Sequence, residues 1–358
     1  MSVHVIAYDT ANPGDTSDLM RNLARFEPAK IRRLALLVKT EGNSDVNDFS
    51  REFGMLSAQT ALSGWAGEAL MDRATFLFST GCEGAMTPFG YLFVDYEESA
   101  GAASKNGKAL AIGCARSRSL TAEEIGTPAH ADITADTVKK AMQDAGVSAA
   151  DVALVIVKTP VMSHIAATEA VEKKNKRITS GYSKAVGSLG AGVALGEVDR
   201  ARVRQEAFNT DLELYSRRAM VFSGSELDCV EIMLLANRRG ASGDLLVQTG
   251  HIKDAVDGDG IKAMLREAGC RFDGEGRLLD RDKVVAMLVK GGIAPDGYIR
   301  GCRTTIKTSH LDMDKHVRAT LGGVVASILG SCRSFISANT VHQAPPGGGL
   351  CACIVRTR

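Results

Sequence analysis

The chain has 358 residues, of which 45% are hydrophobic, and its 43 Lys and Arg residues almost balance 42 Asp and Glu residues. At about 150 residues per domain this length predicts two or three units, and a net charge of +1 provides no overall field for nucleic acid or an acidic membrane. The eight cysteines form no CxxC pair and no apolar run reaches the roughly 18 residues of a membrane span, so we expect a cytoplasmic protein with reduced thiols.

The first third of the chain alternates between strand-like and helix-like segments. Three apolar stretches predict strands, and they cover residues 3–8, 34–40 and 75–79. The second strand ends on a lysine, Lys39, and the third ends on a serine, Ser79. A helical pattern covers 15–26, and a second helix is expected to begin near Arg51.

The middle third has the same order of elements. Its predicted strands cover residues 109–115, 152–158 and 218–223. The second of these strands again ends on a lysine, Lys158, and the third again ends on a serine, Ser223. A helix is predicted over 138–146, where Gly146 is placed to end it, and Lys184 lies at the start of the next helical segment.

The last third repeats the order once more. Strands are predicted over residues 245–252, 284–290 and 333–337, and a helix over 261–269. Lys290 and Ser337 end the second and third strands, and Arg318 lies at the start of the second helix. After Pro345 and Pro346, three consecutive glycines predict a loop before a final buried strand that carries Cys351 and Cys353 on one face.

Three copies of one order of elements predict an internal repeat. We expect an α/β (α+β) fold of three similar units, with boundaries at 1–103, 107–242 and 243–358. Packed around a pseudo-threefold axis, the strands would form a β-barrel-like core with the helices outside.

The repeated lysines and serines predict a functional site. A single lysine at a strand end usually extends to solvent, and a single serine there usually begins a turn. Three such pairs at the same end of three units, together with Arg51, Lys184 and Arg318, would gather many cations in one small volume. Because like charges repel and lose hydration there, this arrangement indicates a ligand or a chemical task.

The residue types favour acyl transfer. Serine needs a neighbouring base to become a nucleophile, and no histidine recurs beside the serines, so lysine is the base that the pattern offers. Backbone N–H groups after each serine are suited to an oxyanion, at the pairs Ser79-Thr80, Ser223-Gly224 and Ser337-Ala338. Three donor sets and several cations would suit a flat ring with several carbonyls, so we expect a cyclic imide or ureide as substrate.

Several motifs resemble those of the ring-opening amidohydrolases, the family of cyanuric acid hydrolase and barbiturase. They are KTEGN at 39–43, VNDFSRE at 46–52, FSTGCEG at 78–84, SGSELD at 223–228, APDGYIRG at 294–301 and VHQAPPGGG at 341–349. The resemblance implies three units with a Ser-Lys pair in each, a homotetramer, and cleavage of a ring C–N bond without a catalytic metal. It implies Ser223 as nucleophile and Lys158 as base, and it implies a substrate-binding role for Ser79, Ser337, Lys39, Lys290, Arg51, Lys184, Arg318, Thr80, Gly224 and Ala338.

The sequence also departs from the family pattern. Lys184 replaces an arginine, while Thr80 and Ala338 replace glycines, so we expect altered recognition of the substrate. A structural Mg²⁺ or Ca²⁺ ion is implied in the C-terminal loop, at Thr340, Gln343, Ala344, Pro345 and Gly348. The acidic residue that the family has after the third lysine is absent here, where Gly291 and Gly292 follow Lys290.

Two other functions stay open at this point. One is a protein that keeps this pocket and binds a small molecule without hydrolysing it, although the presence of both Lys158 and Ser223 favours an enzyme. A cysteine amidase would use Cys82 beside Glu83. The sequence does not choose among cyanuric acid, a barbiturate and a related ring.

Overall fold

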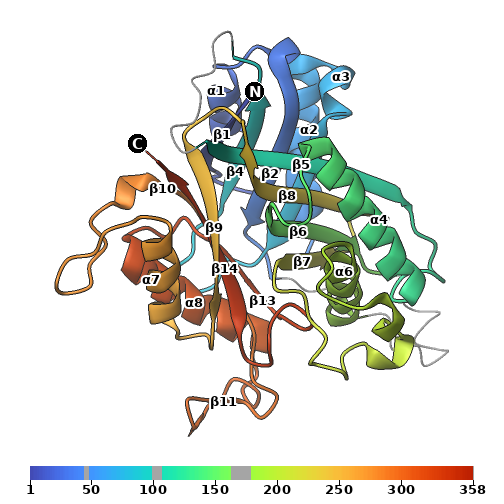
Figure 1. Cartoon of the computed structure of the whole chain (residues 1–358), viewed down its shortest axis with the longest axis vertical. Coiled ribbons are helices and arrows are strands. Elements are labelled where there is room, and N and C mark those ends of the chain that lie inside the picture. The colour runs from blue at the N-terminus through green and yellow to red at the C-terminus, as the bar shows by residue number, and fades with distance from the viewer. Residues whose placement is uncertain (44–47, 99–106, 163–178, 358) are drawn as a thin grey trace.

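The structure is a computed structural model that describes residues 1–43, 48–98, 107–162 and 179–357. Three four-stranded sheets form its centre (Figure 1). The first contains β1 (Ser2–Asp9), β2 (Ile31–Thr40), β3 (Ala74–Thr80) and β4 (Phe89–Tyr96). The second contains β5 (Lys108–Ser119), β6 (Val152–Pro160), β7 (Ala219–Gly224) and β8 (Cys229–Arg239). The third contains β9 (Leu245–Ile252), β10 (Val284–Gly291), β13 (Phe335–Ala338) and β14 (Gly349–Arg356).

All three sheets have the same strand order. In each, the first strand pairs with the fourth, the fourth with the second, and the second with the third. The second and third strands run parallel, as β2 with β3, β6 with β7 and β10 with β13, and the other pairs are antiparallel. Parallel pairing brings the carboxyl ends of the second and third strands to one edge, and these are the ends that carry the predicted lysines and serines.

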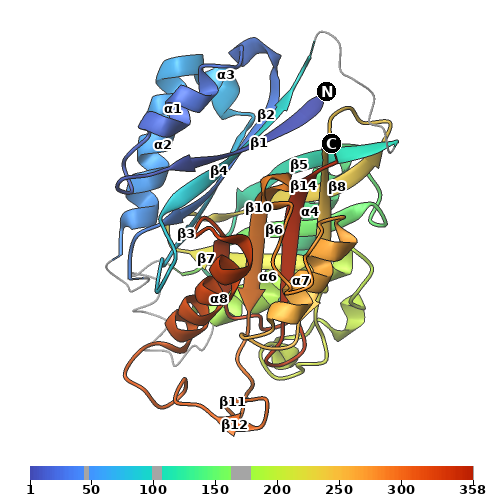
Figure 2. The same cartoon turned by 90° about the vertical axis from the view of Figure 1, so that its left-hand side faces the viewer.

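Helices cover the outer face of each sheet (Figures 1 and 2). They are α1 (Ser17–Leu23), α2 (Ser50–Ala66) and α3 (Glu68–Met71) on the first sheet, α4 (Pro128–Ala145) and α6 (Ser180–Ala194) on the second, and α7 (Gly258–Glu267) and α8 (Met313–Leu329) on the third. Smaller elements are η1 (Pro28–Lys30), η3 (Arg200–Arg202), η4 (Gln205–Ala207), η5 (Arg281–Lys283), and the ribbon of β11 (Tyr298–Ile299) and β12 (Cys302–Arg303). Local sequence explains the ends of α4, because Pro128 begins it and Gly146 ends it in the left-handed region at φ 64°.

Alternating side chains divide the core into layers. One face of every sheet contributes to a single central cluster, which includes Leu37, Phe89, Ile156, Phe222, Leu288 and Phe335. The other face of each sheet packs against its own helices in a separate cluster. Since both faces are buried, the central strands are near-continuous apolar runs, and this is why the sequence pattern predicts them.

Each strand and helix that the sequence predicted is present, and the final strand lies after the three glycines as expected. The fourth strands of the first two sheets, β4 and β8, were not predicted. The β-barrel-like core takes the form of three sheets around one hydrophobic cluster; across the described residues no hydrogen-bonded ladder closes them into a barrel. The pseudo-threefold axis and the unit boundaries stay predictions, and the first boundary falls in 99–106, outside the described residues.

Hydrogen bonds between polar side chains and neighbouring sheets tie the three units together. Asp144 at the end of α4 accepts hydrogen bonds from Arg32 and Arg33 of β2, at 3.1 and 2.6 Å. The Tyr91 hydroxyl of β4 accepts a hydrogen bond from the Met287 N–H of β10 at 3.1 Å. Among the described helices, none is both long enough and apolar enough to cross a membrane.

Candidate active site

Three buried lysines lie where the sequence predicted them, at the ends of β2, β6 and β10. Lys39, Lys158 and Lys290 are at most 1% exposed. Two of them reach a neighbouring sheet, because Lys158 Nζ donates to the Phe78 carbonyl at 2.7 Å and Lys290 Nζ donates to the Val221 carbonyl at 2.6 Å. Lys39 Nζ donates to the Thr80 carbonyl of its own sheet at 2.8 Å. The lysine side chains therefore converge on the junction of the three sheets.

Burial lowers the pKa of all three ammonium groups. The pKa of Lys39 falls to about 7, chiefly because the side chain is desolvated. Desolvation also lowers the pKa of Lys158, although the neighbouring carboxylate of Glu226 opposes the shift. The pKa of Lys290 falls well below its usual value through burial and the nearby charge of Lys184. Lys39, with its pKa near 7, can therefore accept a proton near neutral pH, which an exposed lysine cannot do.

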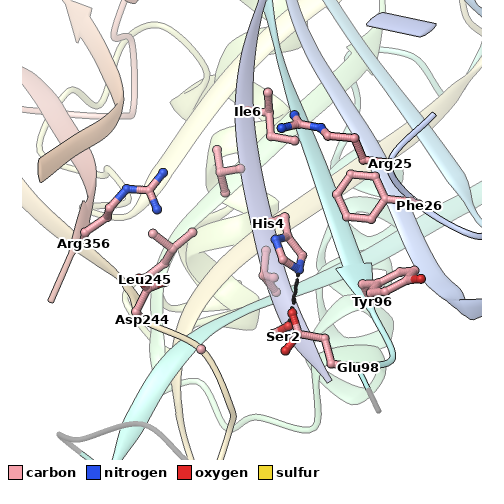
Figure 3. A pocket seen from close by; sticks show the side chains of 13 residues that line it. Ser2, His4, Ile6, Arg25, Phe26, Tyr96, Glu98, Asp244, Leu245 and Arg356 are labelled. Atoms are coloured by element: carbon pink, nitrogen blue, oxygen red, sulfur yellow. Dashed lines mark hydrogen bonds and ion pairs between the residues drawn. The ribbon is translucent and has the colours of Figure 1, made fainter. Parts of the chain in front are cut away.

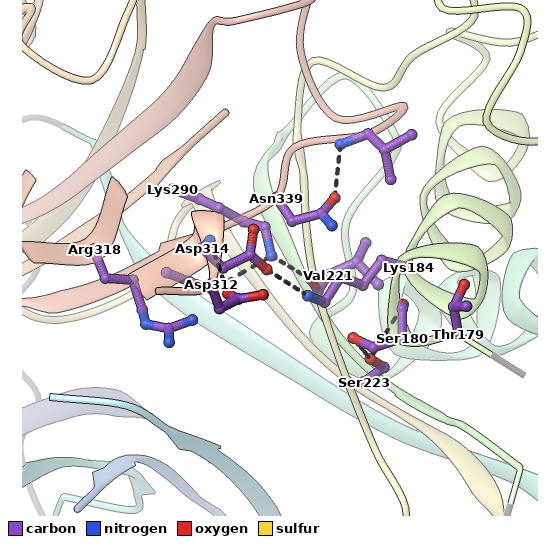
Figure 4. Close-up of polar contacts among 12 residues, drawn as sticks. Thr179, Ser180, Lys184, Val221, Ser223, Lys290, Asp312, Asp314, Arg318 and Asn339 are labelled. Atoms are coloured by element: carbon purple, nitrogen blue, oxygen red, sulfur yellow. Dashed lines mark hydrogen bonds and ion pairs between the residues drawn. The ribbon is translucent and has the colours of Figure 1, made fainter. Parts of the chain in front are cut away.

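The three helix cations each pair with a carboxylate of another unit. Arg51 of α2 donates to Glu226 after β7 at 3.0 Å. Arg318 of α8 forms two hydrogen bonds with Glu83 after β3, at 2.7 and 2.6 Å. Lys184 of α6 lies 3.6 Å from Asp314 of α8 (Figure 4). The pairs connect the first unit to the second, the second to the third, and the third to the first.

The carboxylates of these pairs were not predicted as site residues. Glu83 follows Ser79 by four positions and Glu226 follows Ser223 by three, so a shared acidic residue after the strand-end serine was a usable signal. Burial opposes the ionisation of Glu226, but Lys158 and Arg51 outweigh it and hold its pKa below the usual value. Glu226 also contacts the Lys158 ammonium directly. These carboxylates orient the cations that line the site.

Two of the three predicted Ser-Lys pairs are in contact through their side chains. Lys39 Nζ lies 3.4 Å from Ser79 Oγ, and Lys290 Nζ lies 3.4 Å from Ser337 Oγ. Ser79 and Ser337 are both buried. In each pair the lysine and the serine lie opposite one another in a parallel ladder, so their side chains project from the same face of the sheet.

The Ser-Lys pair of the second unit makes different contacts from the other two pairs. Lys158 Nζ donates to the main-chain carbonyl of Ser223 at 3.4 Å, whereas Ser223 Oγ lies 2.8 Å from Ser180 Oγ at the start of α6 (Figure 4). Within the described residues, the structure gives no hydrogen bond between the Lys158 and Ser223 side chains. The role of this pair as the catalytic one stays a prediction.

The residues after the serines have different backbone conformations from those expected. Thr80 and Ala338 both lie within strands, so neither residue strains the backbone. Positive φ occurs one residue later in each case, at Gly81 with 97° and Asn339 with 68°. Gly224 faces the Glu226 carboxylate so closely that an added Cβ would lie 2.0 Å from Oε2, which explains glycine at this position.

The C-terminal loop does not fit the implied Mg²⁺ or Ca²⁺ ion. Thr340 Oγ1 donates to the Gly348 carbonyl at 2.8 Å, and Gln343 Oε1 accepts the Val221 N–H at 2.8 Å. An added Cβ on Gly292 would lie 2.2 Å from Thr340 Oγ1, so the place of an acidic side chain is filled. Hard cations prefer carboxylates and free oxygens, and the predicted residues Thr340, Gln343, Ala344, Pro345 and Gly348 offer no carboxylate.

The cysteine alternative has little support from the geometry. Cys82 Sγ donates to the Thr40 carbonyl at 3.5 Å, and burial raises the pKa of this thiol. The carboxylate of Glu83, its expected partner, is held by Arg318. A thiol whose pKa is raised by burial is a poor nucleophile.

A hollow in the surface lies far from these lysines. Its volume is about 540 Å³, and its lining includes His4, Arg25, Tyr96, Glu98 and Arg356 (Figure 3). It opens at the starts of β1 and β9, which is the end of the sheets opposite to Lys39. None of the predicted site residues lines it.

The chain is similar to proteins of one family along its whole length. A family model described as amidohydrolase ring-opening protein matches residues 3–356. A cyanuric acid amidohydrolase from Enterobacter cloacae is 33% identical over 369 residues, and the match covers 100% of each chain. A cyclic amide hydrolase from Azorhizobium caulinodans is also 33% identical over 369 residues, and that match covers 99% of each chain.

Two solved structures of cyanuric acid hydrolases are also similar to this chain over its whole length. A cyanuric acid hydrolase structure matches with a TM-score of 0.89 at 31% identity, over 99% of both chains. The cyanuric acid hydrolase structure from A. caulinodans matches with a TM-score of 0.87 at 34% identity, over 100% of this chain and 99% of the other.

Proposed function

Because the chain belongs to the ring-opening amidohydrolase family, as its motifs predicted, we propose that it hydrolyses a ring C–N bond of a cyclic amide. One observation supports this proposal most directly. Buried lysines with lowered pKa values lie beside strand-end serines at the junction of three sheets. A lysine that is neutral near pH 7 can take the proton of a serine, which makes the serine a nucleophile.

The proposed substrate is a flat cyclic ureide or imide. Its carbonyl oxygens would accept hydrogen bonds from Arg51, Lys184 and Arg318, which reach the site from three helices. The two guanidinium groups offer planar pairs of donors, while Lys184 offers a single ammonium. The residues are suited to cyanuric acid, a barbiturate or a related ring.

The proposed reaction proceeds through an acyl-enzyme. Neutral lysine accepts the serine proton while the serine oxygen attacks a ring carbonyl carbon, and the developing oxyanion is stabilised by nearby N–H groups and cations. The ring C–N bond then breaks, and its nitrogen receives the proton from lysine. Water attacks the ester in the same way, so the net reaction consumes one water and releases a ring-opened acid and the free serine.

A panel of cyclic amides tests this function. The purified protein is mixed with cyanuric acid, barbituric acid and a substituted pyrimidine, and the loss of ring absorbance is followed. We expect turnover of at least one compound, and no turnover by a matched variant that carries Ser79→Ala, Ser223→Ala and Ser337→Ala together. Calorimetric binding of a ring without any loss of absorbance would favour the alternative, a small-molecule binding protein.

A further inference from the structure

A smaller hollow, between the first and second units, reaches the contacts of Lys158. Its volume is about 240 Å³, and its lining includes the exposed Asp72, so it is open to solvent. Phe78 and Glu226 also line it, and the Lys158 ammonium contacts the Phe78 carbonyl and the Glu226 carboxylate. The space is large enough for several water molecules. The hollow therefore brings solvent close to an ammonium group that is itself buried.

Glu231 lines the same hollow and lies beside Lys158. The two residues are opposite one another in the antiparallel ladder of β6 with β8, so both side chains project from the same face of the second sheet. That face meets β3, which is an edge strand of the first sheet. Lys158 Nζ donates to the Phe78 carbonyl of β3 at 2.7 Å, and Glu231 accepts a hydrogen bond from the Phe76 N–H at 3.4 Å. The lysine and the carboxyl group therefore reach neighbouring points of one strand edge.

Charged groups surround the inner end of the hollow. Glu226 has one carboxylate oxygen 3.0 Å from the Arg51 guanidinium and presents the other to Lys158. Arg116 lies 3.5 Å from the Glu231 carboxylate. Burial raises the pKa of Glu231, and the charge of Glu226 adds to the shift, although Arg116 and Lys158 oppose it. A carboxyl group of this kind holds a proton closer to neutral pH than an exposed glutamate does.

Lys158 needs a route for its proton if it acts as a base. A general base must be neutral at the start of each turnover. Lys158 is 1% exposed, so a proton that it holds reaches solvent only through a neighbouring group. Its contacts with Phe78 and Ser223 are to main-chain carbonyls, whereas its contact with Glu226 is to a carboxylate, which can accept a proton. Glu226 is therefore suited to the first step of the route.

We propose that Glu226 and Glu231 carry the Lys158 proton to solvent through this hollow. The inference rests on the proposed ring-opening function and on Lys158 as the base that the family resemblance implies. The Lys158 ammonium gives a proton to the Glu226 carboxylate, and the electron pair of the broken N–H bond stays on Nζ. Water in the hollow takes a proton from Glu226 and passes one to Glu231, which releases it to solvent. Both carboxylates are restored, so no other reactant is consumed.

Kinetics with a small buffer test the route. Glu231→Gln keeps the shape of the side chain but cannot carry the proton, so kcat should fall about 10-fold while KM stays near the native value. Imidazole is small enough to enter the hollow and titrates near neutral pH, so it should restore kcat of this variant as its concentration rises. A bulky sulfonate buffer of similar pKa should not restore it. The kcat of the native enzyme should not depend on imidazole.

Two further variants separate proton transfer from structure. Asp72→Asn changes an exposed carboxylate of the same hollow, so kcat should stay within about 2-fold of the native value and show no response to imidazole. Ala74 also lines the hollow, and Ala74→Leu fills the space without removing a carboxyl group. It should lower kcat, and imidazole should not restore the rate. Thermal unfolding of each variant verifies that it is folded.

Each outcome decides for or against the route. A loss of kcat in Glu231→Gln that imidazole restores supports it. A loss that no buffer restores means that Glu231 has only a structural role, and an unchanged kcat means that the proton leaves by another way. Either of these results overturns the inference, while ring opening by the native protein still supports the proposed function. If the native protein opens no ring of the panel, the proposed function fails and the inference fails with it.

Discussion

At the scale of single residues, the site depends on charges that are buried and paired. Lys158 contacts Glu226, and Glu226 in turn receives the Arg51 guanidinium. Removing a charge from water costs several kcal/mol, and a partner of opposite sign offsets much of that cost. Lys39 differs because its hydrogen-bond partners, Ser79 and the Thr80 carbonyl, are neutral. Desolvation of the buried side chain is the main cause of the fall of its pKa to about 7.

The pH dependence of turnover tests whether a buried lysine is the base. A base must be deprotonated to act, so kcat/KM should rise with pH, and the rise should lie near pH 7 if the base has the pKa of Lys39. The rise reflects loss of a proton, which means that activity falls on the acid side of the pKa. Initial rates between pH 5.5 and 9, with a ring that does not itself titrate in that range, provide the measurement. A flat profile would contradict a lysine base.

Glu226 is expected to be a structural requirement of the site. Glu226→Gln keeps the shape of the side chain but leaves Lys158 and Arg51 without their anion, so it should destabilise the fold by about 3–5 kcal/mol. Urea denaturation measures the change. Asp136→Asn is the control, because Asp136 pairs with Lys139 at the surface and its loss should cost less than about 1 kcal/mol. Equal effects of the two variants would contradict this prediction.

At the scale of strands, the register of β6 with β7 decides which side chain faces the centre. Phe222→Ala should destabilise the protein by about 3–5 kcal/mol, since a buried ring leaves a cavity among three sheets. Ser223→Ala, one residue away, should cost about 1 kcal/mol or less, because only a surface hydrogen bond to Ser180 is lost. Thermal and chemical unfolding of both variants provides the comparison. A larger loss from Ser223→Ala would mean that the register is wrong.

The strand ends explain how much of the site can be predicted from sequence. Apolar runs that end on Lys39, Lys158 and Lys290 identify the three strands and their buried lysines directly. The register of strand pairing cannot be predicted in this way, because the segments RAMVFS and TFLFST have the same local pattern, an apolar strand that ends near a serine. Only the pairing of the neighbouring strand determines that Ser79 faces its lysine and Ser223 does not. Glu83 and Glu226 recur after two of the strand-end serines, but each acidic residue pairs with a cation of another unit, so local patterns do not reveal which cation it binds.

At the scale of the whole molecule, hydrogen bonds between units hold the sheets together. Asp144 of the second unit accepts hydrogen bonds from Arg32 and Arg33 of the first unit and from the Cys114 N–H. Asp144→Ala removes all of these partly buried bonds, so we expect a loss of about 3 kcal/mol in unfolding free energy. Because Asp144 and its two arginine partners are partly shielded from solvent, the loss of unfolding free energy should persist in 0.5 M salt. A change below about 1 kcal/mol in urea denaturation would contradict this prediction.

The mass of the enzyme during the first turnover tests the central claim most directly. Since the leaving nitrogen stays attached to the opened ring, an acyl-enzyme should gain the full mass of the substrate. Rapid quenching, digestion with trypsin and fragmentation should locate this mass on one of the strand-end serines, Ser79, Ser223 or Ser337. An added mass on Cys82, or turnover with no protein-bound mass at any time point, would contradict the account.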